Sequence, residues 1–151
     1  MNGSILINKN NIINNLSEIK KLSPNSKVMT MIKSDAYGHG VIETAKLLRD
    51  SDAFTVATME EAKYLRDSNI NKEIVCLQGF SNKNEYEYCS KNNIKPVIHD
   101  LSQISIIEET QLENKIRIWI KIDTGMNRLG FNNSDFQMIY NICKKNKKID
   151  K

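Results

Sequence analysis

The sequence predicts an α/β fold built from about five successive βα units. Apolar, β-branched runs alternate with amphipathic stretches along the chain, which is the pattern of strands followed by helices. The centres of the apolar runs recur about every 20 to 25 residues, which leaves room for one helix between successive strands. No stretch rich in Gly, Ser or Pro interrupts the series, so we predict no domain boundary within the chain.

Five strands are expected from the apolar runs. They cover residues 28–33, 53–57, 73–77, 95–99 and 116–122. The first and last are nearly continuous in Met, Ile and Val, which is typical of strands covered on both faces. Trp119 lies within the last run and is therefore expected in the core or in strand–helix packing, and Cys76, inside another apolar run, is expected in the core.

Six helices are expected from amphipathic periodicity. They cover residues 10–22, 41–50, 60–67, 84–92, 101–110 and 134–145. The first carries Ile12, Leu16 and Ile19 along one stripe, and Pro24 follows its end, as is usual beyond a helix C-terminus.

Two architectures accommodate five successive βα units. One is a doubly wound open sheet of the flavodoxin-like kind, which is complete at about this length. The other is part of a (β/α)₈ barrel, whose full form needs roughly 250 residues. On length alone, 151 residues favour the open sheet. In both architectures ligands bind where the carboxyl ends of the strands open into loops.

Composition and charge indicate an ordinary soluble protein. The chain has 22 Lys and Arg against 18 Asp and Glu, but the lysines are spread along its whole length, so we expect a solvated basic surface and no nucleic-acid partner. No apolar stretch reaches the roughly 18 residues of a membrane helix. The N-terminus MNGSILIN lacks the basic start and cleavage site of a secretory signal. We therefore expect a cytoplasmic protein with no membrane contact.

No metal or nucleotide motif is present. The three cysteines, Cys76, Cys89 and Cys143, are too few and too scattered for a metal cage or a disulfide framework. The chain has no CxxC, HExxH or Gly-rich phosphate loop. We therefore expect no metal.

The first segment with chemical potential is MIKSDAYGHG, residues 31–40. An apolar strand ends in Lys33, and a short polar loop containing Tyr37 and His39 leads into a helix. A lysine at the carboxyl end of a buried strand is partly desolvated, which favours the neutral amine that forms a Schiff base. The alternative is a lysine that simply reaches solvent. His39 is interpreted as an organiser of the loop.

The second segment is KIDTGMNRLGF, residues 121–131. A strand delivers Lys121 and Asp123 to its carboxyl end on one face. Gly125 and Gly130 bracket a loop that carries Arg128. Its guanidinium could bind a carboxylate, a phosphate or a phenolate oxygen, or it could form a salt bridge that only organises the loop.

Taken together, the run KSDAYGHG and, some ninety residues later, the run KIDTGMNRLGF closely resemble alanine racemase, a pyridoxal-phosphate enzyme of fold type III. The resemblance covers nearly the whole chain, beginning with a short N-terminal strand. Ser34 is a mild departure, because family members more often have another small residue there. The resemblance implies the barrel, with this chain as its first five βα units and a sixth strand beginning near residues 148–150.

The family's functional residues can be carried over one by one. Lys33 matches the lysine that holds pyridoxal 5'-phosphate as an aldimine and exchanges a proton with the substrate α-carbon. Tyr37 matches a tyrosine that contacts the cofactor phosphate. Arg128 matches the arginine near the cofactor's phenolic oxygen and the substrate carboxylate. Lys121 matches a lysine, carbamylated in several members, that positions this arginine.

The implied reaction interconverts L-alanine and D-alanine, which supplies D-alanine for peptidoglycan. It needs a second base, which in the family is a tyrosine from the other subunit of a homodimer. None of the helical tyrosines can be given that role here: Tyr64, Tyr86, Tyr88 and Tyr140. The remaining barrel strands and the C-terminal β-domain of the family are absent from this sequence. We therefore expect an incomplete fragment that is a poor racemase alone.

Two other functions remain open. Substrate specificity depends largely on the part that is absent, so a racemase of serine, lysine or broad specificity fits the same motifs. A non-catalytic remnant fits the short length. A flavodoxin-like binding domain would leave the Lys33 and Arg128 segments unexplained.

Overall fold

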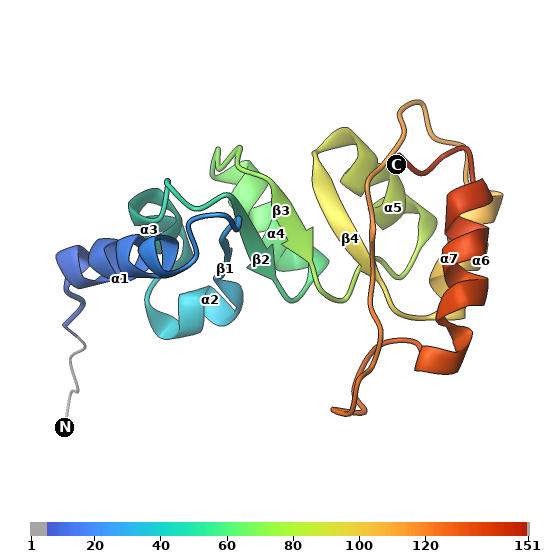
Figure 1. Ribbon diagram of the computed structural model, residues 1–151. Helices are drawn as coiled ribbons and strands as arrows, with labels where there is room; N and C mark the ends of the chain where they lie inside the picture. The colour runs from blue at the N-terminus through green and yellow to red at the C-terminus, as the bar shows by residue number, and fades with distance from the viewer. Residues whose placement is uncertain (1–5, 151) are drawn as a thin grey trace, which may run out of the picture.

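The computed structural model describes residues 6–150 of the chain. The short N-terminal strand expected from the resemblance begins within residues 1–5, which lie outside the described residues. The expected strands and helices follow one another in the predicted order, and one further short helix, α2, lies between β1 and α3 (Figure 1). The elements are α1 (Lys9–Leu22), β1 (Met29–Met31), α2 (Lys33–Gly38), α3 (Val41–Leu47), β2 (Ala53–Val56), α4 (Met59–Asp67), β3 (Ile74–Cys76), α5 (Lys83–Lys91), β4 (Ile94–Ile98), α6 (Leu101–Glu109), β5 (Trp119–Ile120), η1 (Asn133–Asp135) and α7 (Phe136–Lys145).

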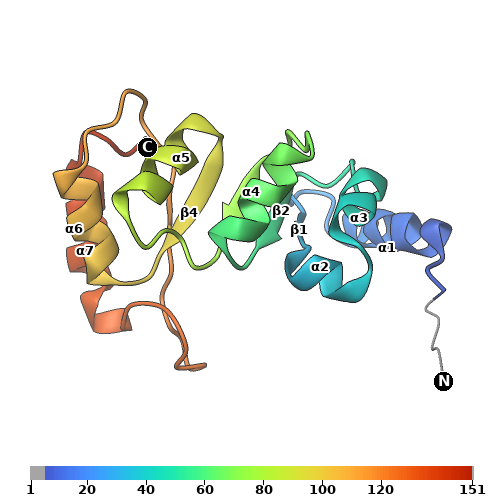
Figure 2. The same ribbon diagram turned by 180° about the vertical axis from the view of Figure 1, so that it is seen from behind.

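The five strands form one parallel sheet in which spatial order follows chain order, β1-β2-β3-β4-β5. From behind, the labelled strands β1, β2 and β4 follow one another in the same succession (Figure 2). A doubly wound sheet reverses its strand order at a switch point, whereas a (β/α) barrel does not. The fold is therefore a partial α/β barrel, and the flavodoxin-like alternative is excluded.

One face of the sheet packs against the helices and forms the core. Strand residues on this face interlock with side chains of helices α3 to α7. The strand residues are Phe54, Val56, Ile74, Cys76, Ile94 and Ile98. The placement of Cys76 in the core is confirmed, since its side chain is fully buried.

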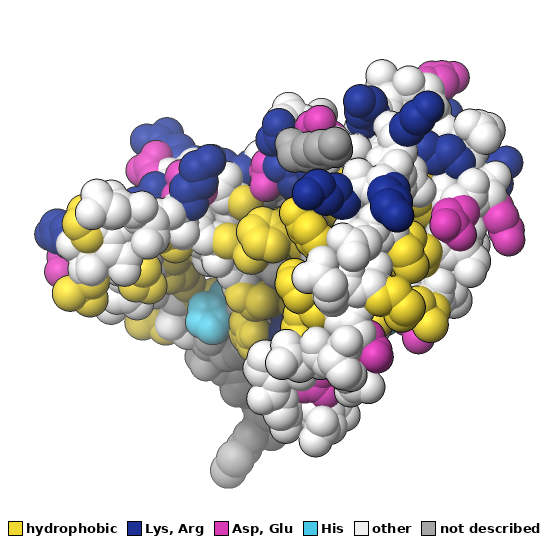
Figure 3. All heavy atoms as spheres, turned by 45° about the vertical axis from the view of Figure 1, so that its right-hand side comes forward, with side chains coloured by type: hydrophobic (Ala, Val, Ile, Leu, Met, Phe, Trp, Pro, Cys, Tyr) yellow, Lys and Arg dark blue, Asp and Glu magenta, His cyan; other side chains and the backbone are white. Residues whose placement is uncertain are grey.

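The opposite face, which we call the inner face, is lined by Met29, Met31, Thr55, Val75 and Trp119, as the strand register shows. Met29 is 43% exposed, Met31 37% and Trp119 50%. The expectation that the first and last strands are covered on both faces is therefore wrong, and so is the placement of Trp119 in the core. The exposure is confined to the first and last strands of this face, since Thr55 and Val75 on the middle strands are each 1% exposed. Hydrophobic side chains line a hollow on the face of the molecule shown in Figure 3.

The last described residues pair with the beginning of the β5 segment. Ile149 forms a parallel bridge with Ile116. The N–H of Ile116 donates to the carbonyl of Lys148 at 3.1 Å, and the N–H of Asp150 donates to the carbonyl of Ile116 at 2.9 Å. This is the segment in which a sixth strand is expected.

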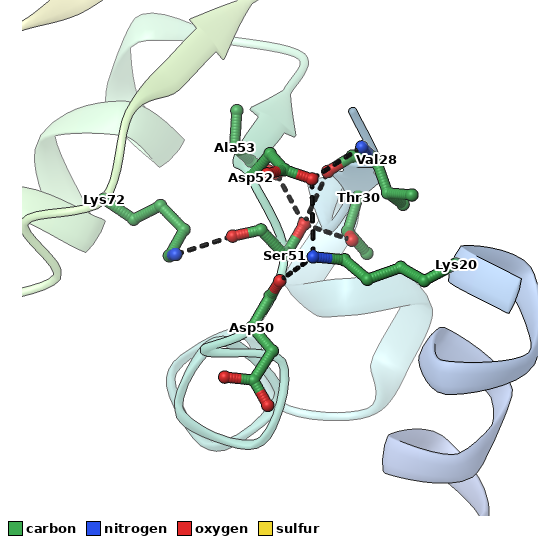
Figure 4. A network of polar contacts seen from close by, with 8 residues as sticks. All are labelled: Lys20, Val28, Thr30, Asp50, Ser51, Asp52, Ala53 and Lys72. Atoms are coloured by element: carbon green, nitrogen blue, oxygen red, sulfur yellow. Dashed lines mark hydrogen bonds and ion pairs between the residues drawn. The ribbon is translucent and has the colours of Figure 1, made fainter. Parts of the chain in front are cut away.

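A polar network fastens the amino ends of β1 and β2 (Figure 4). The buried Ser51 hydroxyl lies 2.6 Å from the Thr30 hydroxyl, 2.8 Å from the Ala53 carbonyl and 3.0 Å from the Val28 carbonyl. The N–H of Val28 donates to Asp52 Oδ2 at 2.7 Å, which is the main reason that the pKa of Asp52 lies below its ordinary value. This network lies at the edge opposite the strand carboxyl ends.

Candidate active site

Lys33 lies two residues beyond the end of β1, at the carboxyl edge of the sheet. Ile32 packs in the helix-covered core, and the chain then turns out of the strand, so that Lys33 is the first residue of α2. The Lys33 side chain is half-buried. Its amine lies 5.9 Å from the centroid of the Tyr37 ring and takes part in none of the ion pairs among residues 6–150. Within residues 6–150, no carboxylate therefore neutralises the Lys33 amine.

The segment after Lys33, expected as a loop, is a left-handed helical turn. Residues Ser34 to Tyr37 have φ between 52° and 55° and ψ between 39° and 52°. This conformation costs an L-residue roughly 1–2 kcal/mol, and none of the four is a glycine. The turn therefore needs specific contacts to persist.

Several contacts hold this turn. Asp35 Oδ1 accepts from the N–H of Val41 at 2.7 Å, and the Asp35 carbonyl accepts from the N–H of Gly40 at 3.0 Å. The His39 ring nitrogen Nδ1 lies 2.9 Å from the Ala36 carbonyl, and Ala36 is buried. His39 thus contacts the backbone of its own loop.

Glu61 ties the turn to the next βα loop. Its Oε1 accepts from the N–H of Ser34 at 2.6 Å. Its Oε2 accepts from the N–H groups of Ala57 at 2.7 Å and Thr58 at 3.2 Å. In return, Thr58 Oγ1 accepts from the N–H of Glu61 at 3.3 Å, which completes a capping box at the start of α4.

The loop that carries Arg128 is organised by Asp123. Asp123 Oδ1 accepts from the N–H of Gly125 at 3.0 Å and of Asn127 at 3.1 Å. These two bonds, the one from Gly125 first, lower the pKa of Asp123. The loop then returns to the strand end, where the N–H of Asp123 donates to the Phe131 carbonyl at 2.9 Å.

Gly130 permits this return. Its φ is +121°, and a Cβ at this position would lie 2.7 Å from the Asp123 nitrogen. Only glycine tolerates so close an approach of the two backbones.

Arg128 lines an open cleft of about 440 Å³ at the carboxyl edge. The cleft is lined by Gln78, Phe80, Ser81, His99, Asp100, Ser102, Gln103, Arg128, Leu129 and Gly130. Gln103 fixes its floor: Oε1 accepts from the N–H groups of His99 at 2.8 Å and Asp100 at 3.3 Å. Gln103 Nε2 donates to the carbonyls of Gln78 at 3.0 Å and Phe80 at 3.2 Å.

The structure brings some of the predicted residues together and leaves others apart. Lys33 and Tyr37 are neighbours, although Tyr37 is 61% exposed. Lys121 and Arg128 belong to the same loop and are both exposed. Among residues 6–150, no hydrogen bond or ion pair joins Arg128 to Lys33, Tyr37 or Lys121.

The helical tyrosines lie on α4, α5 and α7. Tyr64 and Tyr140 are exposed on the molecular surface. Tyr86 is fully buried in the core, and this burial raises the pKa of its phenol far above the ordinary value. A phenol without access to the surface cannot reach a substrate.

Sequence reasoning missed Glu61 and Gln103. Both stand at the third position of a helix whose N-cap is Thr58 or Asp100, and the spacing T-x-x-E and D-x-x-Q was readable as a capping box. Within residues 6–150, no group of three or more His, Cys, Asp or Glu could hold a metal ion. In the same range, no helix is long and apolar enough to cross a bilayer.

Comparison with known proteins places these features in a family. The family described as "Alanine racemase, N-terminal domain" matches residues 7–150. The alanine racemase of Coxiella burnetii is 42% identical over 145 residues, which covers 96% of this chain and 40% of that protein. The biosynthetic alanine racemase of Escherichia coli K12 is 35% identical over 137 residues, covering 91% and 38%.

Solved structures agree. The biosynthetic alanine racemase of Pseudomonas aeruginosa superposes with a TM-score of 0.86 at 28% identity, over 92% of this chain and 39% of that one. The alanine racemase of Clostridium difficile 630 gives a TM-score of 0.81 at 36% identity, over 93% and 38%. The chain thus spans about 40% of the length of the relatives it matches.

Proposed function

The chain belongs to the alanine racemase N-terminal domain family of isomerases, and we propose that it contributes the cofactor-binding lysine of a racemase that interconverts L-alanine and D-alanine. The observation that carries this proposal is Lys33. The residue is half-buried beside the carboxyl end of β1, the edge where α/β barrels place their chemistry, and its amine takes part in none of the ion pairs among residues 6–150. A cytoplasmic role in supplying D-alanine for peptidoglycan is part of the proposal.

The donor set of this edge fits pyridoxal 5'-phosphate. An amine that is free of ion pairs can bond to the cofactor's aldehyde carbon. The phenol of Tyr37, beside that amine, can donate a hydrogen bond to a phosphate oxygen. The guanidinium of Arg128, which lines the cleft at the same edge, suits a phenolate or carboxylate oxygen.

Each residue then has a role that follows from its chemistry. The bound cofactor supplies an electron sink that stabilises negative charge on the substrate α-carbon. Lys33 holds the cofactor and moves a proton to and from one face of that carbon. Arg128 binds and orients the substrate carboxylate, and Lys121 positions Arg128, either as an amine or after carbamylation.

The base that serves the opposite face of the substrate α-carbon comes from outside this chain. A second base is needed there because Lys33 cannot reach both faces, and none of the helical tyrosines is offered for that role. In this proposal the chain forms the N-terminal part of the barrel domain. The remaining barrel strands and a C-terminal β-domain belong to the complete enzyme, which forms a homodimer. The same residue roles also fit a racemase of serine, lysine or broad specificity.

The test is to incubate the chain with pyridoxal 5'-phosphate, reduce with sodium borohydride and map the modified lysines by mass spectrometry. We expect the adduct to concentrate on Lys33 among the 18 lysines. Lys33→Ala removes that selective adduct, whereas Lys46→Ala, on the exposed face of α3, leaves it unchanged. Equal labelling of all exposed lysines would contradict the proposal and favour a non-catalytic remnant.

A further inference from the structure

The two carboxylate oxygens of Glu61 serve two different segments. Oε2 accepts from Ala57 and Thr58, which are adjacent to its own helix. Oε1 accepts from Ser34, which lies 27 residues earlier in the chain, at 2.6 Å. The first oxygen completes the cap of α4, so the second is available to hold the loop that follows β1.

This second contact fixes the backbone at Lys33. Before the lysine, the N–H of Ile32 donates to the Thr55 carbonyl at 2.9 Å and continues the β1–β2 ladder. After it, the N–H of Ser34 donates to Glu61. Because a peptide unit is planar, a bond to the Ser34 N–H fixes the orientation of the whole Lys33–Ser34 peptide.

Ser34 needs such a contact because it is the first residue of the left-handed turn, with φ 52°. An unrestrained L-residue favours the extended or right-handed regions. Rotation of Ser34 to either region would redirect the peptide that carries the Lys33 side chain.

We propose that Glu61 is the positioning residue for Lys33: its Oε1 holds the Ser34 amide, keeps the turn left-handed and thereby fixes the backbone from which the Lys33 side chain extends. This role rests on the proposed function of Lys33. Glu61 acts through the backbone and is not itself a catalytic residue.

The chain contains its own example of what glutamine does at this position. Gln103 stands at the same place in the capping box of α6. Its oxygen accepts from the cap-side amides, and its NH₂ group points to the preceding loop. A glutamine at position 61 in this orientation would keep the cap but set its NH₂ group against the Ser34 N–H, where two donors cannot bond.

The decisive variant is therefore Glu61→Gln, which keeps the capping box and loses only the Ser34 contact. Glu61→Asp is a second variant, because it keeps the charge in the first turn of α4 but shortens the reach. The matched control is Glu85→Gln in α5. Among residues 6–150, the Glu85 carboxylate hydrogen-bonds only to Ser81, directly before its own helix.

Two measurements are made on the 151-residue chain. Amide NMR with hydrogen exchange reports the Ser34 N–H. We expect this proton to be deshielded and protected in the wild type and in Glu85→Gln, and to lose both properties in Glu61→Gln while Ala57 stays protected. Borohydride labelling with pyridoxal 5'-phosphate reports Lys33, whose modification relative to Lys46 should fall about tenfold in Glu61→Gln and Glu61→Asp.

The two proposals fail in different ways. If wild-type Lys33 is not labelled selectively, the proposed function is wrong, and the Ser34 amide still decides whether Glu61 holds the turn. If Lys33 is labelled selectively and equally fast in wild type and Glu61→Gln, the positioning role is wrong. An unchanged Ser34 amide in Glu61→Gln also overturns it.

Discussion

The starts of α4 and α6 are built alike, but the residue that closes the capping box is a glutamate in one and a glutamine in the other. Each has an N-cap residue, Thr58 or Asp100, and a third residue whose side chain closes the capping box. In α4 that residue is Glu61, and the terminal atom that the cap does not use is an oxygen that accepts from the N–H of Ser34. In α6 it is Gln103, and the corresponding atom is a nitrogen that donates to the carbonyls of Gln78 and Phe80.

The difference shows that the neighbouring loop determines the choice between Glu and Gln. Either residue satisfies the cap, since both provide an oxygen for the cap amides. Only a carboxylate can accept from a further N–H, and only an amide can donate to further carbonyls. The same helix start is thereby adapted to two loops of opposite polarity.

Replacing the amide nitrogen of Gln103 by a carboxylate oxygen should have the largest effect on stability. Gln103→Glu sets a buried carboxylate oxygen against two carbonyl oxygens, 3.0 and 3.2 Å from the present nitrogen. We expect a loss of about 3–5 kcal/mol in the free energy of unfolding at pH 7, measured with urea.

Acidification provides the control for this variant. Burial opposite carbonyls raises the pKa of the new carboxyl above the unfolded value of about 4.3. The destabilisation is therefore largest at neutral pH and shrinks as the pH falls toward the unfolded value. A deficit that stays constant from pH 7 to pH 4.5 would contradict the electrostatic explanation.

The next largest effect should follow from crowding the Gln103 amide. Gly79 has φ +65°, and a Cβ there would lie 2.4 Å from both Gln103 Nε2 and the Val97 carbonyl oxygen. Gly79→Ala should lower the free energy of unfolding by about 2–4 kcal/mol through strain and a displaced amide. A loss below that of an ordinary surface substitution would show that this loop can shift freely.

Removing the cap alone should cost less and should separate it from the loop contact. Thr58→Ala deletes the hydroxyl that accepts from the Glu61 N–H. We expect a loss of about 1 kcal/mol in the free energy of unfolding, measured with urea. The Glu61–Ser34 bond does not use this hydroxyl. Slow exchange of the Ser34 amide should therefore persist, and rapid exchange would mean that the two contacts are one unit.

The smallest effect should be the acid sensitivity of the α6 cap. Hydrogen bonds from Ser102, the hydroxyl first and then the N–H, lower the pKa of Asp100. Its stabilising contribution is thus present above the unfolded pKa of about 3.9 and is lost as the pH falls through the lower folded pKa. Asp100→Asn should match the wild type at pH 7 and lose less stability at pH 3, whereas identical pH profiles would exclude the role.

Much of the fold could be predicted from the sequence because it depends on local periodicity. The five strands and six helices follow from alternating apolar patterns, and the position of Lys33 at a strand end follows from the same pattern. The strand order could not be derived from periodicity, and length alone favoured the wrong architecture.

The site was less predictable for physical reasons. Nothing in Ser-Asp-Ala-Tyr indicates positive φ, because the turn is imposed by contacts with Glu61 and Val41. Such a contact joins residues 27 apart and leaves no periodic signal. The exposure of Trp119 depends on whether another element covers the inner face, which its own apolar neighbours do not reveal.

The chain-ordered sheet also bears on how the protein folds. Each strand pairs with the one that precedes it in the chain, at a separation of about one βα unit. Within residues 6–150 the contact order of the sheet is therefore low for a parallel arrangement, because each strand pair joins neighbouring βα units. Such a sheet can grow unit by unit from its N-terminal end while the polypeptide is still being synthesised.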